Sequence, residues 1–216
     1  MLIEDVASLK IPYEFGCDED TEETYGMIEV RNQLDDDVIT KWGCSKFVLL
    51  FDEEPNFIVK IPFNGMYEFV EANEDDYGRY EFIPFQTEDY CAIEASVYND
   101  ALVAGVAQFF TKTEFAGVTI NNCPYYISEK AIDFNEYSRI KTPSANSMEK
   151  AKSLRSQSEL SSRWLALAID TYGEDAVNQL LQFIKDNDIR DLHSANIGFR
   201  AEDGSPVIID YSGYVG

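Results

Sequence analysis

The sequence has few of the residues that bind zinc or form disulfide frameworks, and it has no long hydrophobic run. Its 216 residues include one histidine and four cysteines, and no two cysteines form a Cys-x-x-Cys pair. This composition argues against a zinc site and gives weak support to a disulfide framework. No apolar run approaches the roughly 20 residues of a transmembrane helix, and the N-terminus lacks the basic start and apolar stretch of a secretion signal. We therefore expect a cytoplasmic protein with reduced thiols and no membrane partner.

Basic residues are also scarce. The 17 lysines and arginines stand against 40 aspartates and glutamates, which gives a formal net charge of −23. The imbalance is concentrated in residues 1–100, where 25 acidic and 6 basic residues give −19. A field of this sign disfavours nucleic acid and anionic membranes, so we expect no direct nucleic-acid binding. The charge has two interpretations: it keeps the protein soluble, or it forms an acidic surface that captures a basic partner.

Hydrophobic residues make up 45% of the sequence, which is enough for a folded core. In the first part of the chain, apolar residues alternate with polar ones or form short runs, as they do in β-strands, and acidic turns separate these segments. We expect two neighbouring hairpins of an antiparallel sheet, with strands at residues 27–31, 38–42, 46–51 and 57–62.

The second part of the chain favours helices. From residue 90 to 110, apolar residues recur every three or four positions, which is the period of a helix. Residues 138–162 contain eight serines, and we expect a mobile, partly helical connection there. The remaining predicted elements are strands at 118–120 and 125–128, helices at 164–169 and 174–184 on either side of Gly173, and a final hairpin with strands 197–200 and 206–209.

Three oxygen-bearing side chains lie close to this final hairpin. Asp191 and Asn196 are five residues apart in the loop that precedes it, and Asp210 follows its second strand. A carboxylate at a strand end and an asparagine amide on the facing loop can share one cation, and magnesium prefers such oxygen ligands. Phosphoryl transfer from ATP needs these metal ligands together with an acceptor for the proton of the substrate hydroxyl group.

Residues 190–196 read R-D-L-H-S-A-N, and with Asp210 they resemble the catalytic loop and metal-binding aspartate of the protein-kinase-like superfamily. The D-L-H-x-x-N variant is especially similar to aminoglycoside phosphotransferase-type enzymes and to short kinases encoded by bacteriophages. The resemblance implies that Asp191 is the catalytic base and that His193 braces the loop. It also implies that Asn196 and Asp210 bind Mg²⁺.

Upstream segments extend the resemblance to about residues 36–213. The F-I-V-K strand that ends at Lys60 is similar to the V-A-I-K strand, which implies that Lys60 holds the ATP phosphates. Glu94 resembles the helix glutamate that pairs with that lysine. The hairpin at residues 42–46 stands where a phosphate-covering loop belongs, and residues 126–131 resemble the hinge that meets adenine. The nucleotide-binding residues implied by the resemblance are Lys60, Gly43, Ser45, Glu129 and Ala131.

Each of these residues also has an ordinary structural interpretation when it is taken alone. Lys60 could extend from an edge strand into water, and Glu94 could be a surface glutamate. Asn196 and Asp210 could be turn formers. Their order along the chain, with lysine and glutamate before the base, the asparagine and the final aspartate, favours the kinase-like interpretation.

We expect an α+β protein with a reduced, bilobal, protein-kinase-like fold. Residues 1–131 are expected to form an acidic N-lobe with an antiparallel sheet and one long helix, and residues 132–216 a truncated helical C-lobe. The expected function is ATP- and magnesium-dependent phosphotransfer, by a Ser/Thr protein kinase or autokinase of phage type that acts on host proteins.

The sequence also departs from the kinase pattern. The hairpin around Gly43 has one glycine where kinases have G-x-G-x-x-G, and Ile189 stands where many kinases have histidine. Asp210 is followed by Y-S-G rather than F-G, and the chain ends three residues after Gly213. These departures leave a second hypothesis, in which a catalytically weak, kinase-like binding module inhibits a basic host protein through its acidic surface.

Overall fold

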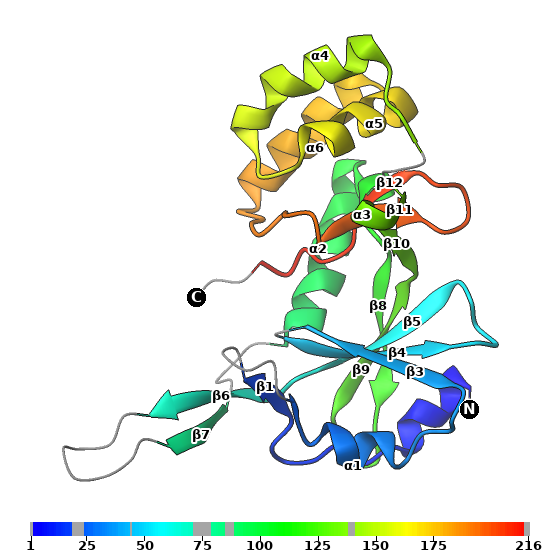
Figure 1. Ribbon diagram of the computed structural model, residues 1–216, viewed down its shortest axis with the longest axis vertical. Coiled ribbons are helices and arrows are strands. Elements are labelled where there is room, and N and C mark those ends of the chain that lie inside the picture. Colours follow the sequence, from blue (N-terminus) through cyan, green and yellow to red (C-terminus); the bar gives the residue numbers. More distant parts are fainter. Residues whose placement is uncertain are drawn as a thin grey trace. The chain divides into compact units, whose positions relative to one another are not determined.

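The structure is a computed structural model that describes residues 2–18, 24–43, 45–70, 79–84, 89–137 and 141–213. The chain divides into two compact units. Helices and antiparallel sheets occur in the same chain, which confirms the predicted α+β class (Figure 1). The predicted boundary after residue 131 stays a prediction. Unit 1 comprises Met1–Ile93 and Glu114–Ser128, and unit 2 comprises Glu94–Thr113 and Glu129–Gly216.

A five-stranded sheet is the centre of unit 1. Its first three strands form an antiparallel meander, as the sequence predicted, because short connections at residues 43–45 and 52–56 join them. The prediction of a strand at residues 118–120 is wrong: the strand comes earlier, and Thr119 belongs to a turn in which its N–H donates to the Cys123 carbonyl. In spatial order the strands are β3 (Val38–Trp42), β4 (Lys46–Phe51), β5 (Phe57–Pro62), β9 (Pro124–Glu129) and β8 (Thr113–Val118).

One face of this sheet carries the core of unit 1, and the short helix α1 (Met27–Arg31) contributes to that core. The prediction of a strand at residues 27–31 is wrong. Met27 and Val30 are buried while Ile28 is 72% exposed, and a buried spacing of three residues is helical. Arg31 donates to Thr40 Oγ1 and lies 5.2 Å over the Trp42 ring, which connects α1 to β3.

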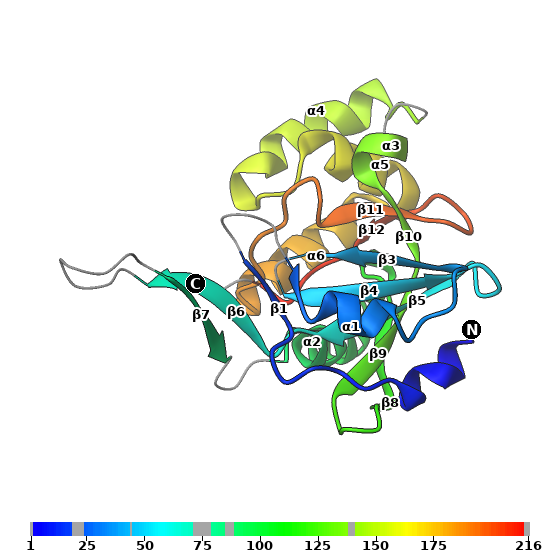
Figure 2. The same cartoon turned by 60° about the horizontal axis from the view of Figure 1, so that its bottom comes forward.

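A second, smaller sheet completes unit 1, together with the 3₁₀ helix η1 (Ile3–Ser8). Its strands β1 and β6 run parallel, and β6 and β7 form an antiparallel ribbon (Figure 2). The parallel pair includes two glycines because the backbones approach closely: a Cβ atom on Gly16 would lie 2.2 Å from the Gly65 carbonyl oxygen. In spatial order the strands are β2 (Thr24–Tyr25), β1 (Gly16–Asp18), β6 (Gly65–Val70) and β7 (Arg79–Pro84).

Unit 2 packs helices against a three-stranded antiparallel sheet. The helix α2 (Tyr90–Ala104) begins in unit 1 and continues into unit 2, followed by η2 (Ala107–Phe109). Trp164 is fully buried in the core, and its indole N–H donates to the Gly198 carbonyl, which connects a helix to the sheet. The other elements are β10 (Ala131–Asp133), α3 (Phe134–Tyr137), α4 (Ala145–Leu154), η3 (Arg155–Gln157), α5 (Ser162–Tyr172), α6 (Glu174–Asp186), β11 (Ile197–Arg200) and β12 (Pro206–Ile208).

The helices of unit 2 follow the predicted pattern. The break at Gly173 is confirmed, and its φ of 89° explains why glycine separates α5 from α6. The serine-rich segment contains the helix α4, with Ser144 as its N-cap, and its residues 138–140 lie outside the described part of the chain. Among the described residues, no helix has the length and apolar character needed to cross a membrane.

Candidate functional site

The loop between α6 and β11 is anchored by apolar side chains and presents a half-exposed carboxylate. Ile189 and Leu192 are buried in the core of unit 2, and the Leu192 N–H donates to Glu159 Oε2 at 3.1 Å. Between them, Asp191 adopts a left-handed conformation with φ of 60°. Aspartate is one of the few residue types that tolerate this region, and such outliers cluster at functional sites. The loop conformation therefore sets the direction in which the Asp191 side chain leaves the backbone.

Asn196 connects Asp191 to the end of β12. Its Nδ2 donates to the Asp191 carbonyl at 2.8 Å and to Asp191 Oδ2 at 3.1 Å. Its own carbonyl accepts hydrogen bonds from the N–H groups of Ile209, at 2.8 Å, and of Asp210, at 3.3 Å. The structure thus brings together the three residues that the sequence singled out in this part of the chain.

His193 braces the same loop. Its Nδ1 accepts a hydrogen bond from the Ala195 N–H at 3.1 Å, and its Nε2 lies 3.3 Å from Asp191 Oδ1. Because Nδ1 is the acceptor, the proton of the neutral ring is on Nε2, where it can be donated to Asp191. The Ala195 N–H thus holds the histidine ring through Nδ1, and the ring helps to orient the Asp191 carboxylate through Nε2.

Asp210 and Tyr211 leave β12 in different surroundings. Asp210 Oδ1 accepts a hydrogen bond from Ser212 Oγ at 3.0 Å, whereas the Tyr211 side chain is buried. Tyr211 Oη donates to the Thr111 carbonyl at 2.6 Å and lies 3.3 Å from Thr113 Oγ1, which donates to Glu94 Oε2 at 3.3 Å. Glu94, predicted as a site residue, is fully buried, and the hydroxyl groups of Thr113 and Tyr211 connect it to the end of β12.

Lys60 lies in β5, which has neighbouring strands on both sides, and its side chain is 3% exposed. The alternative that it extends from an edge strand into water is therefore wrong. Lys60 belongs to unit 1 and Glu94 to unit 2, and their pairing stays a prediction. Gly43 and Ser45 flank the β3–β4 turn, where the Gly43 N–H donates to the Lys46 carbonyl. Among the described residues other than its chain neighbours, no atom lies within 4 Å of the position of a Cβ atom on Gly43.

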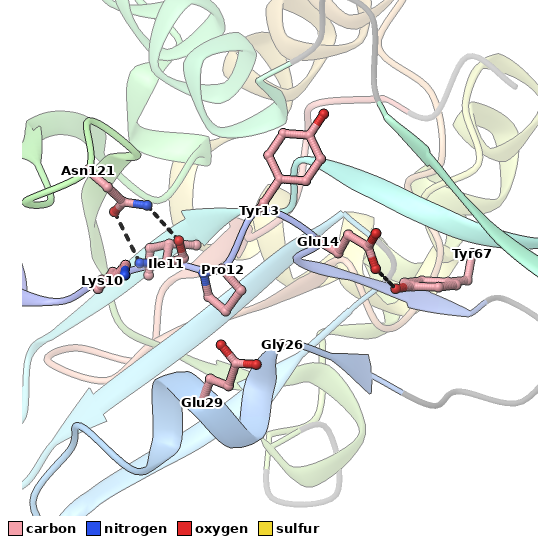
Figure 3. A pocket seen from close by; sticks show the side chains of 9 residues that line it. All are labelled: Lys10, Ile11, Pro12, Tyr13, Glu14, Gly26, Glu29, Tyr67 and Asn121. Carbon is pink, nitrogen blue, oxygen red and sulfur yellow. Dashed lines mark hydrogen bonds between the residues drawn. The ribbon is translucent and has the colours of Figure 1, made fainter.

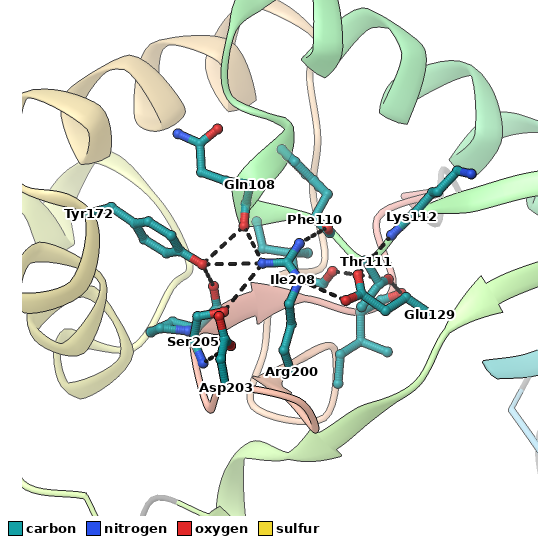
Figure 4. Close-up of polar contacts among 12 residues, drawn as sticks. Gln108, Phe110, Thr111, Lys112, Glu129, Tyr172, Arg200, Asp203, Ser205 and Ile208 are labelled. Carbon is teal, nitrogen blue, oxygen red and sulfur yellow. Dashed lines mark hydrogen bonds and ion pairs between the residues drawn. The ribbon is translucent and has the colours of Figure 1, made fainter. Parts of the chain in front are cut away.

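Glu129 and Ala131, the predicted hinge residues, are connected to Arg200 on β11. Ala131 is opposite Arg200 in the sheet, and Glu129 Oε1 accepts from the Arg200 Nε at 2.8 Å. Arg200 also donates to the carbonyls of Gln108 and Phe110, so it holds the segment after α2, residues 129–131 and the β11–β12 hairpin together (Figure 4). The Glu129 N–H donates to the Lys112 carbonyl, so this N–H group already forms a hydrogen bond to the backbone of unit 2.

Unit 1 also has a groove of about 710 Å³ that the sequence did not predict. Its lining includes the exposed residues Tyr13, Glu14 and Glu29, and the Tyr13 ring points away from Glu29 (Figure 3). Glu14 accepts a hydrogen bond from the Tyr67 hydroxyl group, which fixes its position. The other lining residues are Lys10, Ile11, Pro12, Gly26 and Asn121.

The chemistry available at these sites is that of oxygen ligands. No group of three His, Cys, Asp or Glu side chains in the described ranges is arranged as a metal site. Asp191, Asn196 and Asp210 instead combine two carboxylates with an amide.

Burial raises the pKa of the Cys123 thiol to about 12, and the nearby Asp89 adds to the effect, so this thiol stays protonated at neutral pH.

Sequence reasoning missed several residues that support the loop and the sheet. Glu159 accepts a hydrogen bond from the N–H group of Leu192, which is 33 residues away, so no local sequence pattern indicates this contact. Lys46 is 4% exposed on β4, and its relation to Lys60 follows only from the register of two strands.

Comparison of the chain with protein-family models and with curated proteins finds no match.

Proposed function

We propose that the chain is a small ATP- and magnesium-dependent phosphotransferase with a protein-kinase-like fold, acting on serine or threonine hydroxyl groups of host proteins or on itself. The observation that carries the proposal is the hydrogen-bonded cluster of Asp191, Asn196 and Asp210 in unit 2. These are the residues that the resemblance to phage kinases and aminoglycoside phosphotransferases assigns to the base and the metal site.

In this proposal Asp191 accepts the proton of the substrate hydroxyl group. Asn196 and His193 both contact its carboxylate, so the base is held in one orientation before the substrate binds. A fixed general base of this kind contributes roughly 10²–10⁴-fold to a reaction rate. Lys60 is assigned to the phosphates of ATP, and Glu94 to the positioning of Lys60.

The residues present fit a magnesium ion. The Asn196 Nδ2 donates to Asp191, so the Oδ1 is the amide atom that can act as a ligand. Asp210 supplies a carboxylate, and two oxygen ligands from the protein are typical of magnesium, which keeps several waters and binds substrate phosphates. When bound, the ion would neutralise charge on the phosphates. Asn196 and Asp210 would hold it.

The test is transfer of labelled phosphate from ATP in the presence of Mg²⁺, with the protein itself and a mixed Ser/Thr protein substrate as acceptors. Asp191→Asn is expected to lower transfer about 10²–10⁴-fold. The matched control is Asp188→Asn, because Asp188 also has a positive φ, of 51°, and its carboxylate pairs only with the exposed Arg190 among the contacts of the described chain. Asparagine tolerates this backbone region at both positions. Equal activity in the two variants, or no transfer by the unmodified protein, contradicts the proposal.

A second candidate function is favoured by the groove on unit 1. Its exposed glutamates suit a lysine or arginine side chain of a partner, because carboxylates attract cations. In this candidate the chain is a kinase-like binding module that inhibits a basic host protein. The two functions are compatible, since the groove and the Asp191 cluster belong to different units.

A further inference from the structure

We propose that Glu159 is a positioning residue for the base Asp191, and that it acts through the peptide group that joins Asp191 to Leu192. This inference rests on the proposed function, because it concerns the side chain that accepts the substrate proton there. Glu159 belongs to the serine-rich segment, and neither the kinase-like motifs nor the order of the predicted site residues assigns it a role. The evidence is the set of hydrogen bonds around this peptide group and the backbone conformation of Asp191.

The peptide group between Asp191 and Leu192 is held on both of its sides. Its N–H, which belongs to Leu192, donates to Glu159 Oε2 at 3.1 Å. Its carbonyl, which belongs to Asp191, accepts from Asn196 Nδ2 at 2.8 Å. Because a peptide group is planar and rigid, these two hydrogen bonds fix its orientation. They thereby limit rotation of the backbone at the Asp191 Cα atom, from which the side chain extends.

The backbone of Asp191 needs such a restraint. Its φ of 60° lies in the left-handed region, which is unfavourable for most residues other than glycine and persists only where the surroundings impose it. In this conformation the two carboxylate oxygens face different partners: Oδ2 accepts from Asn196 at 3.1 Å, and Oδ1 lies 3.3 Å from His193 Nε2. A rotation of the backbone at Asp191 would move the carboxylate away from these partners. Glu159 therefore contributes to the orientation of the base through the backbone.

Glu159 can act as a restraint because its own segment is anchored. Glu159 is exposed and lies between η3 and α5, whereas the next residue, Leu160, is fully buried in the core of unit 2. The Leu160 N–H donates to Ser158 Oγ at 3.3 Å, and Ser161 Oγ caps α5 by accepting from the Trp164 N–H at 3.1 Å. The Glu159 carboxylate thus extends from a segment that a buried side chain and a helix cap hold in place.

The charge of Glu159 also acts on the residue before the base. Arg190 donates to both carboxylate oxygens of Asp188 at 2.9 Å. These hydrogen bonds raise the pKa of Arg190 above its ordinary value, and the negative charge of Glu159 adds to the effect. Glu159 therefore interacts with the residues on both sides of Asp191, and its ionised carboxylate is a stronger acceptor for the Leu192 N–H than a neutral group would be.

The experiment measures the rate of phosphate transfer at saturating ATP and Mg²⁺, together with the KM for ATP, in variants of the full chain. Glu159→Ala is expected to lower the rate about tenfold to a hundredfold, because a misplacement of about 1 Å in a catalytic group can cost about 10²-fold. The KM for ATP is expected to change less than about threefold, because the phosphates are assigned to Lys60 and to the metal ligands. Glu159→Gln keeps an acceptor oxygen on a side chain of the same length, and its rate is expected to stay within about fivefold of that of the unmodified protein.

The single histidine of the chain provides a readout that does not depend on activity. Because His193 Nε2 lies 3.3 Å from Asp191 Oδ1, the NMR chemical shift of this nitrogen reports on the orientation of the carboxylate. The Nε2 signal, detected through the C–H protons of the ring, is expected to move in Glu159→Ala and to keep its position in Glu159→Gln. A general loss of stability lowers the amount of folded protein but does not move the signal of the folded molecules.

The matched control is Glu149→Ala, which removes an exposed carboxylate from α4 in the same serine-rich segment. It is expected to leave both the rate of transfer and the histidine signal unchanged. Equal rates in the two alanine variants overturn the inference. An equal loss in Glu159→Ala and Glu159→Gln also overturns it, because the effect then comes from charge alone, and so does a loss in Glu159→Ala without a change in the histidine signal.

The outcomes also separate this inference from the proposed function. If the unmodified protein transfers phosphate and Glu159→Ala transfers it equally well, the inference is wrong and the proposed function stands. If the unmodified protein transfers no phosphate, Asp191 is not a base, and the proposed function and the inference both fail. A lower rate in Glu159→Ala, rescue by Glu159→Gln and a shifted histidine signal in the alanine variant together support the inference.

Discussion

Tyr211 is the residue that connects the end of β12 to the buried glutamate of α2. Its hydroxyl group donates to the Thr111 carbonyl and lies beside Thr113, which donates to Glu94. Burial raises the pKa of Tyr211, and the negative charge of Glu94 raises it further, so the hydroxyl group is protonated at neutral pH and can donate. The Tyr211 side chain thus contributes hydrogen bonds as well as a buried ring.

Tyr211→Phe is expected to lower the free energy of unfolding by about 1–3 kcal/mol, because the buried Thr111 carbonyl loses its donor while the ring is retained. Urea denaturation measures the change. Tyr13→Phe is the control: its side chain is 82% exposed, and surface substitutions usually change stability by less than about 0.5 kcal/mol. If Tyr211→Phe is as stable as the control, the hydroxyl group of Tyr211 has no structural role.

At the scale of elements, Asp170 joins α4 to α5. Its carboxylate accepts hydrogen bonds from the Ser144 N–H and Oγ, both at 2.8 Å, and from the Ser147 Oγ at 2.6 Å. Partial burial opposes ionisation, but these hydrogen bonds and the nearby Lys141 hold the pKa of Asp170 below its ordinary value. The first turn of α4 therefore depends on a charged carboxylate from the next helix.

Asp170→Asn is expected to lower the free energy of unfolding at pH 7 by about 1 kcal/mol, as loss of a helix cap does. A depressed pKa contributes stability above the pKa of the unfolded state, and this contribution disappears as the pH falls through the folded pKa. The difference between the variant and the unmodified protein is thus expected to shrink below about pH 4. Urea titrations at pH 7 and pH 3 measure it, with Glu149→Gln, an exposed acid on α4, as the control.

Long elements are predicted from the sequence more accurately than short ones. The helices α2, α5 and α6 have several turns of periodic apolar residues, and the sequence predicted all three. Residues 27–31 are too short to distinguish a strand from a helix, because M-I-E-V-R fits either period. The error at residues 118–120 has the same origin: Val118 and Ile120 are apolar but exposed, and the strand depends on pairing with β9.

The candidate site was predictable where it is local in the sequence. Asp191 and Asn196 are five residues apart, and a short hairpin separates them from Asp210, so their proximity follows from spacing alone. The diagonal relation of Lys46 and Lys60 requires the register of two strands, which a sequence does not specify. The Arg200 hydrogen bonds and the contact between Glu159 and Leu192 join segments far apart in the chain, and no pattern indicates them.

For the whole molecule, the dominant property is the uneven charge. Unit 1 has 24 acidic and 6 basic residues, whereas unit 2 has 16 and 11. Unit 1 also carries the groove with Glu14 and Glu29. A general electrostatic field would attract any cation to unit 1, whereas a specific site would depend on the groove. Variants with equal charge separate these two effects.

A lysine-rich peptide of ten residues is a suitable probe for the binding-module candidate. Its affinity is expected to fall about tenfold between 0.05 and 0.5 M NaCl, because the screening length shortens from above 10 Å to below 8 Å over this range. The double variant Glu14→Gln, Glu29→Gln is expected to bind more weakly than Asp52→Asn, Glu53→Gln, which neutralises two exposed acids in the β4–β5 turn. Fluorescence anisotropy measures both. Affinity that does not depend on salt, or that falls equally in the two double variants, contradicts a basic partner in the groove.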